Sequence, residues 1–322
     1  MIPVRDTIPS KNYPVVNNAL ILINVYFFIL QHTQGGDIGR FIYTYGLVPA
    51  KYSVPLITAQ FTTAEKLFSL VSYMFLHGGI WHLVSNMWSL YIFGDNVEDY
   101  FGSIRYLIFY LLCGILSGLF HLLFNIYANI PTIGASGAIA GVMGAYFILY
   151  PKSKILTLIP IIIIPWFVEI PAFIFLGLWL VIQLINAAGN NAMGGGIAWW
   201  AHIGGFIVGI LLLRLAPRIP ANGLTKRIKE VTVRKKTPHL QVIQATGVAD
   251  DPHLYGTIVI SPYEAASGTT KLVNIPWGYM KRLYRIAIPP GISSGKTLRL
   301  KGMGRQFPGG EKGDMMLRVI IA

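Results

Sequence analysis

Charged residues are scarce in this chain. Asp, Glu, Lys and Arg make up 12% of its 322 residues, whereas hydrophobic residues make up 54%. A soluble domain carries about twice that share of charge, so the composition excludes an ordinary soluble globular protein. Cysteine is almost absent, and because Cys113 stands alone no disulfide can form within the chain. The composition indicates a membrane protein.

Acidic residues are half as numerous as basic ones, and the basic excess is unevenly spread. Residues 1–216 hold nine Lys or Arg and seven Asp or Glu, whereas residues 217–322 hold seventeen and six. The chain therefore divides into a nearly neutral apolar part and a basic polar part. The predicted organisation is an N-terminal cytoplasmic tail over 1–14, a membrane domain over 15–216, a basic linker over 217–240 and a second domain over 241–322.

Six apolar runs have about the 20-residue length that crosses a bilayer as a helix. They are 15–32, 77–94, 105–126, 133–151, 168–188 and 197–216. The apolar run 155–167 is broken by Pro160 and Pro165, so we expect it at the surface or as the lead-in to the fifth span. No cleavage site follows the first run, which we interpret as a retained span. The fold predicted for 15–216 is an all-α bundle of six transmembrane helices.

Lys and Arg in the short loops predict the orientation. With the N-terminus inside, the inner segments hold Arg5, Lys11, Arg105, Lys152, Lys154 and Arg214. The short outer segments 127–132 and 189–196 hold no Lys or Arg. We therefore predict a multi-pass protein of the cell membrane with both termini in the cytoplasm. The second, fourth and sixth spans then all begin at the outer face.

Four polar side chains fall near the beginning of those three spans. His82 and Asn86 lie in the second span, Ser136 in the fourth and His202 in the sixth. Each alone is explained by helix packing or by an interhelical hydrogen bond. Together at one depth they indicate a functional site, because polar groups in a span are costly. Small residues that let helices approach closely lie beside them, at Gly134, Gly137, Gly141 and Gly205.

Two of the chemistries that cut peptide bonds in membranes lack their residues. A zinc hydrolase of the usual kind has the pattern H-E-x-x-H, whereas His77 and His82 are five apart with no acid between them. An aspartyl mechanism needs two facing carboxylates, and no acid lies at the depth of Ser136. No acid is placed to orient His202 either. A serine centre here would be a Ser-His dyad, without metal or cofactor.

Three stretches resemble rhomboid intramembrane serine proteases. They are Gly134–Gly137, Ala201–Phe206 and Phe75–Met87, and the resemblance extends over most of the six-span region. It implies that Ser136 is the nucleophile, that His202 is the general base, and that His82 and Asn86 donate to the oxyanion. It also implies cleavage of transmembrane helices of other membrane proteins near their outer ends.

Two other classes of protein compete with a protease. A rhomboid-like pseudoprotease would bind membrane helices without cutting them, and loss of the serine or histidine would mark it. Neither residue is lost here. A transporter would show inverted repeats and charged midplane residues, which the sequence lacks.

The basic part begins with a cluster over 226–236, where six of eleven residues are Lys or Arg. Such a cluster beside a membrane attracts anionic headgroups by about 1 kcal/mol per charge. It lacks a recognisable nucleic-acid-binding motif, so we predict no nucleic-acid partner. Strand-like runs and one short helix over 261–268 follow, which predicts a small, mostly β (α+β) soluble domain.

The second domain resembles the C-terminal substrate-binding domain of DnaJ-type (Hsp40) co-chaperones. The similar stretches are Ser261–Thr270, Ile288–Ile292, Leu298–Gly304 and Gly313–Met315. The resemblance implies that residues 241–322 bind an extended peptide, or the tail of an Hsp70-type chaperone, on a sheet edge. The His-Pro-Asp of J-domains is absent from the chain, so stimulation of an Hsp70 ATPase is not implied. A domain kept for stability or membrane docking is the alternative.

Overall fold

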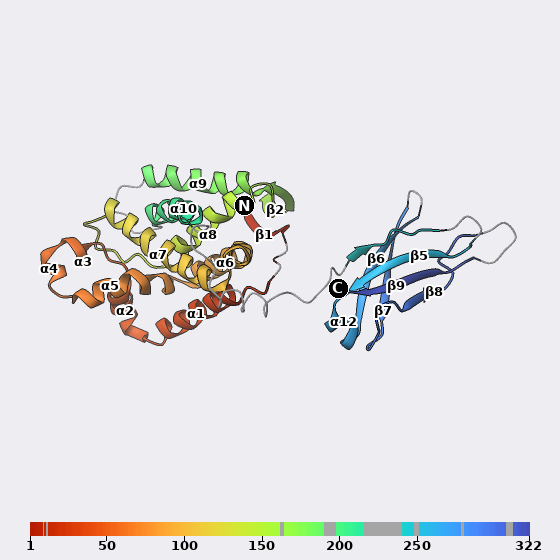
Figure 1. Ribbon diagram of the computed structural model, residues 1–322. Coiled ribbons are helices and arrows are strands. Elements are labelled where there is room, and N and C mark those ends of the chain that lie inside the picture. The colour runs from red at the N-terminus through yellow and green to blue at the C-terminus, as the bar shows by residue number, and fades with distance from the viewer. Residues whose placement is uncertain are drawn as a thin grey trace. The chain divides into compact units, whose positions relative to one another are not determined.

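The chain forms two compact units, a helical unit over Met1–Val233 and a β unit over Arg234–Ala322 (Figure 1). The computed structural model describes residues 1–8, 10, 12–161, 164–189, 198–215, 240–247, 251–277, 280–306 and 312–322. Nearly all of the predicted basic linker 217–240, including the cluster over 226–236, lies outside the described residues. So does all but the first residue of the predicted outer segment 189–196.

Helices occupy all six predicted spans. They are α1 (Val15–His32), α6 (Ile80–Phe101), α7 (Ser103–Phe124), α8 (Ser136–Leu149), α9 (Ala172–Gly189) and α10 (Trp199–Leu215). Within the described residues, α1, α7 and α9 are long and apolar enough to cross a membrane, and α6 with the helices before it makes a fourth span if that bent pair counts as one. The other two, α8 and α10, have 14 and 17 residues and fall short of about 20. The helical membrane unit is as predicted, but the count of six spans is not confirmed.

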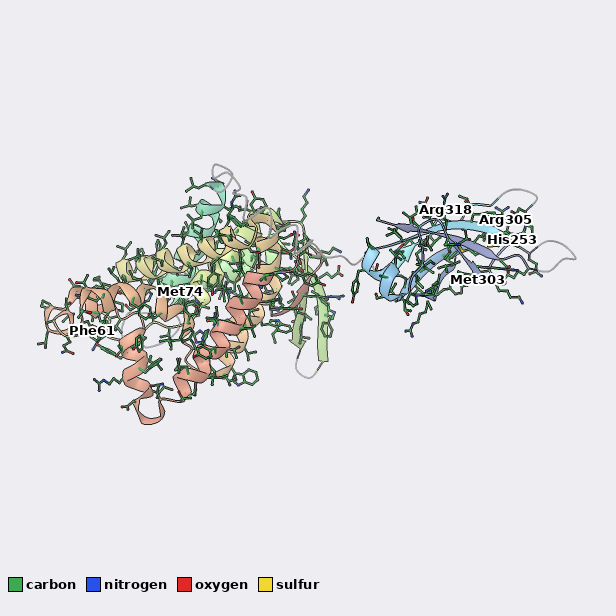
Figure 2. The ribbon with its side chains drawn as sticks, turned by 60° about the horizontal axis from the view of Figure 1, so that its bottom comes forward. Phe61, Met74, His253, Met303, Arg305 and Arg318 are labelled. Carbon is green, nitrogen blue, oxygen red and sulfur yellow. The ribbon has the colours of Figure 1, made fainter. Side chains whose placement is uncertain are left out.

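Short helices fill the long connection between α1 and α6. They are η1 (Gly35–Asp37), α2 (Ile38–Tyr45), α3 (Ala50–Ser53), α4 (Pro55–Thr58), α5 (Thr63–Ser72) and η2 (Tyr73–Phe75). Lys51 is fully buried, and its Nζ donates to the carbonyls of Tyr43 at 2.5 Å and Thr44 at 2.9 Å, at the end of α2. Its charge also lies 4.2 Å from the ring centre of Phe61, which Figure 2 labels. Burial lowers the pKa of Lys51 to about 8, against a smaller opposing effect of Glu65. Lys51 thus supplies hydrogen-bond donors to carbonyls at the C-terminal end of α2, which have no partner within the helix.

The described residues of the run 155–167 form two paired strands that lead directly into α9, the helix of the fifth predicted span. Strands β2 (Lys154–Ile161) and β3 (Ile164–Pro171) pair antiparallel, and β1 (Ile2–Asp6) adds to β2. The many isoleucines of this run favour strands. Pro160 and Pro165 lie opposite each other in the β2–β3 register, where residues without a backbone N–H are tolerated if that position faces away from the inter-strand hydrogen bonds. The predicted start of the fifth span at 168 was therefore wrong, because α9 begins only after β3 ends.

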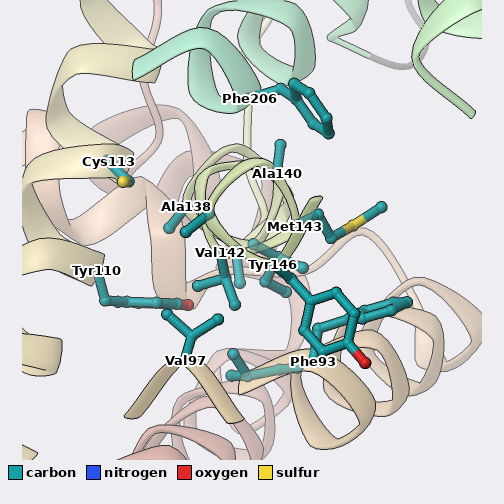
Figure 3. Close-up of a cluster of buried hydrophobic side chains, with 14 of the residues drawn as sticks. Phe93, Val97, Tyr110, Cys113, Ala138, Ala140, Val142, Met143, Tyr146 and Phe206 are labelled. Atoms are coloured by element: carbon teal, nitrogen blue, oxygen red, sulfur yellow. The ribbon is translucent and has the colours of Figure 1, made fainter. Parts of the chain in front are cut away.

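Helix α8 lies at the centre of the helical unit. Figure 3 shows it surrounded by Phe93 and Val97 of α6, Tyr110 and Cys113 of α7, and Phe206 of α10. Its contact with α10 is backbone to backbone. A Cβ built on Gly205 would lie 2.1 Å from the carbonyl oxygen of Gly137, and one on Gly209 would lie 2.0 Å from that of Gly141. Only glycine fits at these crossings, and this close approach sets the distance between the two helices.

In its described residues the β unit contains two three-stranded sheets, in agreement with the predicted mostly β domain. One has the order β4 (Leu240–Val242), β6 (Thr269–Trp277), β7 (Met280–Ile288), and the other β5 (Leu254–Ile260), β9 (Met315–Ile321), β8 (Thr297–Leu300). A shared core contains fully buried Ile258, Val273 and Leu317 from the two sheets. Strands β5 and β9 pair in parallel, so segments about 60 residues apart in the chain lie side by side.

The short predicted helix is α12 (Pro262–Ser267), and a buried ion pair fixes it. Ser261 and Glu264 form a capping box at its start, and Gly268 ends it with a φ of 75°, which favours glycine. Lys271 of β6 donates to Glu264 Oε1 at 2.5 Å, with both side chains buried. At the other end of the unit Figure 2 labels His253 and Arg305.

Asp314 gives the β unit a predicted sensitivity to acid. Its carboxylate accepts from the Gly302 N–H at 2.7 Å and from Arg299 Nε, and these bonds lower its pKa below the ordinary 3.8. A lowered folded-state pKa contributes stability that is full above the unfolded-state pKa and is lost as pH falls through the folded-state value. We expect Asp314→Asn to destabilise the β unit at neutral pH, with the difference from wild type shrinking below pH 3.8. Urea unfolding of the full chain measures this, with cleavage of the β unit by an added protease as the signal that this unit has unfolded. An unchanged difference at low pH would contradict it.

Candidate active site

Ser136 and His202 are brought into direct contact. Ser136 is the first residue of α8 and His202 lies in the first turn of α10, and the Oγ to Nε2 distance is 2.8 Å. The serine is half-buried and the histidine is buried. The contact follows from the glycine crossings described above, which bring α8 and α10 together at Gly137, the residue after Ser136, and again at Gly141. This distance is within reach for proton transfer from a hydroxyl to an imidazole.

Gln183 of α9 contacts the other side of His202. Its Oε1 lies 2.8 Å from His202 Nδ1, and both side chains are buried. The sequence analysis considers only acidic residues as groups that could orient His202, so it does not identify Gln183. A polar amide in the middle of an apolar span was the available signal, since such groups are costly in lipid without a partner.

His82 of α6 faces the same space as Ser136. Its Nδ1 lies 3.3 Å from the Gly78 N–H and accepts from it, so the ring proton belongs on Nε2. A Cβ built on Gly134 would lie 2.8 Å from His82 Nε2 and 3.8 Å from Ser136 Oγ. Gly134 has a φ of 123°, so both its conformation and the close imidazole require glycine. Gly134 lies just before α8, and the absence of a side chain there leaves room for the His82 ring of α6.

Asn86 lies one turn beyond His82 on α6. Its Nδ2 donates to the His82 carbonyl at 2.7 Å, and the side chain is buried. An amide nitrogen carries two hydrogens, so this bond engages one of them. Gly137 and Gly141 also face α7: a Cβ on Gly137 would meet Ser117 Oγ at 2.1 Å, and one on Gly141 would meet Cys113 Sγ at 2.5 Å.

A cleft of about 640 Å³ opens over these groups. Its lining includes Ser136, His202, His82 and Asn86, together with Trp81, Ser85, Ser89, Met143 and Trp179. Two aromatic rings lie near the His202 ring, whose centre is 5.8 Å from that of Trp179 and 6.2 Å from that of Trp199. The site therefore combines a water-accessible cleft with a tightly held imidazole.

Two further histidines lie near the site. The His77 ring is fully buried, 5.2 Å from the His82 ring, with neither nitrogen hydrogen-bonded. His121 Nε2 lies 3.0 Å from Thr132 Oγ1, so His121 of α7 ties down the loop that precedes α8. Among the described residues no three His, Cys, Asp or Glu side chains gather so that they could hold a metal ion. The arrangement is suited to acyl transfer by a serine.

Comparison with known families finds a match for each of the two units. Residues 64–218 match the Rhomboid domain model, and residues 230–322 match the DnaJ C terminal domain model. The chain carries a rhomboid domain followed by a DnaJ C-terminal domain. Both resemblances inferred from the sequence are thereby confirmed. The rhomboid domain contains Ser136, His202, His82, Asn86 and Gln183.

Relatives of the rhomboid domain come from yeast and plants. Rhomboid protein 1, mitochondrial, of Saccharomyces cerevisiae is 31% identical over 198 residues, covering 60% of this chain and 51% of the relative. RHOMBOID-like protein 6, mitochondrial, of Arabidopsis thaliana is 36% identical over 146 residues, covering 44% and 41%. The chain thus spans about half or less of these relatives' lengths. Inactive RHOMBOID-like protein 8 of Arabidopsis thaliana is 33% identical over 92 residues, covering 29% of this chain and 26% of the relative, so likeness to a rhomboid does not by itself establish activity.

Proposed function

We propose that the rhomboid domain is an intramembrane serine endopeptidase that cleaves transmembrane helices of other membrane proteins. The 2.8 Å contact between Ser136 Oγ and His202 Nε2 is the observation that carries the proposal. A pseudoprotease has no need for a nucleophile and a base in hydrogen-bond contact at the bottom of a cleft. Only these two groups exchange a proton with the substrate, so no metal or cofactor is required.

The reaction follows from the groups around the cleft. His202 Nε2 takes the proton as Ser136 Oγ attacks the scissile carbonyl, and it returns that proton to the leaving amine. The carbonyl oxygen becomes an oxyanion near the start of α8, where backbone N–H groups have no intrahelical acceptor. His82 Nε2–H and the second amide hydrogen of Asn86 are the side-chain donors. Water entering the cleft then hydrolyses the acyl-enzyme.

The proposed topology places this site near the outer face. In it α8 and α10 complete six spans, both termini are cytoplasmic, and the protein resides in the cell membrane. A helical peptide bond is shielded by its own hydrogen bonds, so the substrate must unwind locally. We expect cleavage near the outer end of a substrate helix, at a segment with small or helix-breaking residues.

The DnaJ C-terminal domain is proposed to bind extended peptide in the cytoplasm. Among the described strands, β7 and β8 each end a sheet, and such a strand edge offers main-chain hydrogen bonds to a peptide. An Hsp70-type chaperone tail is a second occupant of the same kind. The basic cluster over 226–236 is proposed to bind anionic lipid headgroups.

A serine-directed probe tests the proposed activity and separates it from pseudoprotease binding. The purified chain in liposomes is incubated with a single-span substrate that has small residues near its outer end, with and without a fluorophosphonate. We expect cleavage, its loss on treatment, and phosphonylation of Ser136, in which the serine Oγ forms a bond to phosphorus as fluoride leaves. Ser89, which lies in the same cleft and bonds only its own helix, is the internal control and should stay unlabelled. Substrate binding with neither cleavage nor labelling would instead identify a pseudoprotease.

A further inference from the structure

We propose that Gln183 is a positioning residue that holds His202 in the one neutral tautomer able to act as a base toward Ser136. The bond from Gln183 Oε1 to His202 Nδ1 is part of a chain that begins on α9 and ends at the nucleophile. The catalytic purpose of this chain rests on the proposed protease function, whereas the tautomer itself does not.

The first step fixes the Gln183 amide. Its Nε2 donates at 3.1 Å to the carbonyl of Trp179, one turn earlier on α9. A carbonyl only accepts, so the amide nitrogen must face it and the amide oxygen must face His202. The reversed amide would place two oxygens against each other at this position.

The second step fixes His202. An amide oxygen only accepts, so the proton of the neutral imidazole is on Nδ1 and points at Gln183 Oε1. His202 Nε2 is then unprotonated and accepts from the Ser136 hydroxyl at 2.8 Å. In the opposite tautomer, Nε2–H would face the serine and could not take its proton.

An amide suits this position better than a carboxylate. Gln183 is 4% exposed and His202 9%, and Gln183 does not line the cleft, so the contact between them is buried inside a membrane domain. A charged side chain there is costly, whereas a neutral amide supplies the required acceptor without a charge. Trp179 adds to the restraint, because its ring lies 5.8 Å from the His202 ring. Helix α9 thus restrains His202 in two ways, through the bond from Gln183 to Nδ1 and through the nearby Trp179 ring.

Three variants of the full chain test the proposal. Gln183→Met keeps the shape of the side chain and removes the acceptor, whereas Gln183→Glu keeps an acceptor. Asn186→Leu is the matched control, because Asn186 makes the same kind of bond to a carbonyl four residues back but is only half-buried. We expect Gln183→Met to lower kcat by about 10- to 100-fold with KM and the unfolding midpoint little changed, since general-base catalysis is worth about 10²–10⁴. Gln183→Glu should cleave well above Gln183→Met, and Asn186→Leu should match wild type.

A readout independent of cleavage completes the test. Nitrogen-15 spectra of histidine-labelled protein distinguish protonated from bare ring nitrogens, and the His202 signals are those lost in His202→Ala. We expect Nδ1 protonated in wild type and a mixture of tautomers in Gln183→Met. Wild-type cleavage by Gln183→Met, or a wild-type His202 protonated on Nε2, would overturn the role of Gln183. Absence of cleavage and of Ser136 labelling in wild type would instead overturn the protease, while the spectra still decide the tautomer.

Discussion

Ser136→Ala is expected to lower the cleavage rate by roughly 10,000-fold or more, to the background of the assay. The methyl group keeps the volume at the head of α8 but offers no nucleophile to the scissile carbonyl. His202→Ala should lower the rate about as much, and the double variant should be no slower than either single variant, because the effects of residues that act as one unit are not additive.

His82→Ala should lower the rate less, by about 10²–10³-fold, because it removes one oxyanion donor. Initial rates on one substrate at saturating concentration give the comparison.

Two matched controls accompany these variants. Ser89→Ala removes a hydroxyl from the same cleft, and His121→Ala removes a histidine that bonds only loop residues. Cleavage should survive Ser89→Ala. His121→Ala should lower the unfolding midpoint more than kcat, since its contact with Thr132 holds the loop before α8. Cleavage that persists in Ser136→Ala would sink the serine mechanism outright.

The positions of the long helices and of most strands follow from local patterns in the sequence. Apolar runs predicted the six long helices of the helical unit, α1 and α6 to α10. Alternating apolar residues bounded by turns predicted most strands of the β unit. The run 155–167 shows where such patterns fail. Its prolines argued against a helix, but its pairing with β1, some 150 residues away, is a long-range contact that no local pattern contains. The parallel pairing of β5 with β9 is of the same kind.

The candidate site shows the same division between local and long-range information. Ser136, His202, His82 and Asn86 could be named because each is a costly polar group in an apolar span. Gln183 carries the same signal, yet an amide has no reactivity that draws attention to it. Its role appears only when α9 is packed against α10 and the amide is seen to meet Nδ1 of the base. The relation of Gly134 to the His82 ring likewise depends on the fold, since 52 residues separate them.

Gly209→Ala is expected to be the most disruptive single substitution in the helical unit away from the cleft. The added Cβ would lie 2.0 Å from the carbonyl oxygen of Gly141, whereas ordinary contact begins at 3.4 Å, so the helices must separate by about 1.4 Å. Overpacking costs about 1–3 kcal/mol where side chains can rearrange. Here backbone meets backbone and no rotamer relieves it, so we expect the upper end of that range or failure to fold.

The same substitution should reach the active site. A misplacement of about 1 Å costs roughly 10²-fold in rate, and separation of α8 from α10 lengthens the Ser136 to His202 contact. Gly177→Ala is the matched control, because the nearest atom to its added Cβ is Phe147 Cε2 at 4.0 Å. Alanine is about 1 kcal/mol better than glycine within a helix, so this variant should be neutral or slightly stabilising. Unfolding midpoints and the rate of Ser136 labelling by a fluorophosphonate measure both effects. Equal behaviour of the two variants would show that the α8–α10 crossing does not set the geometry of the serine and histidine.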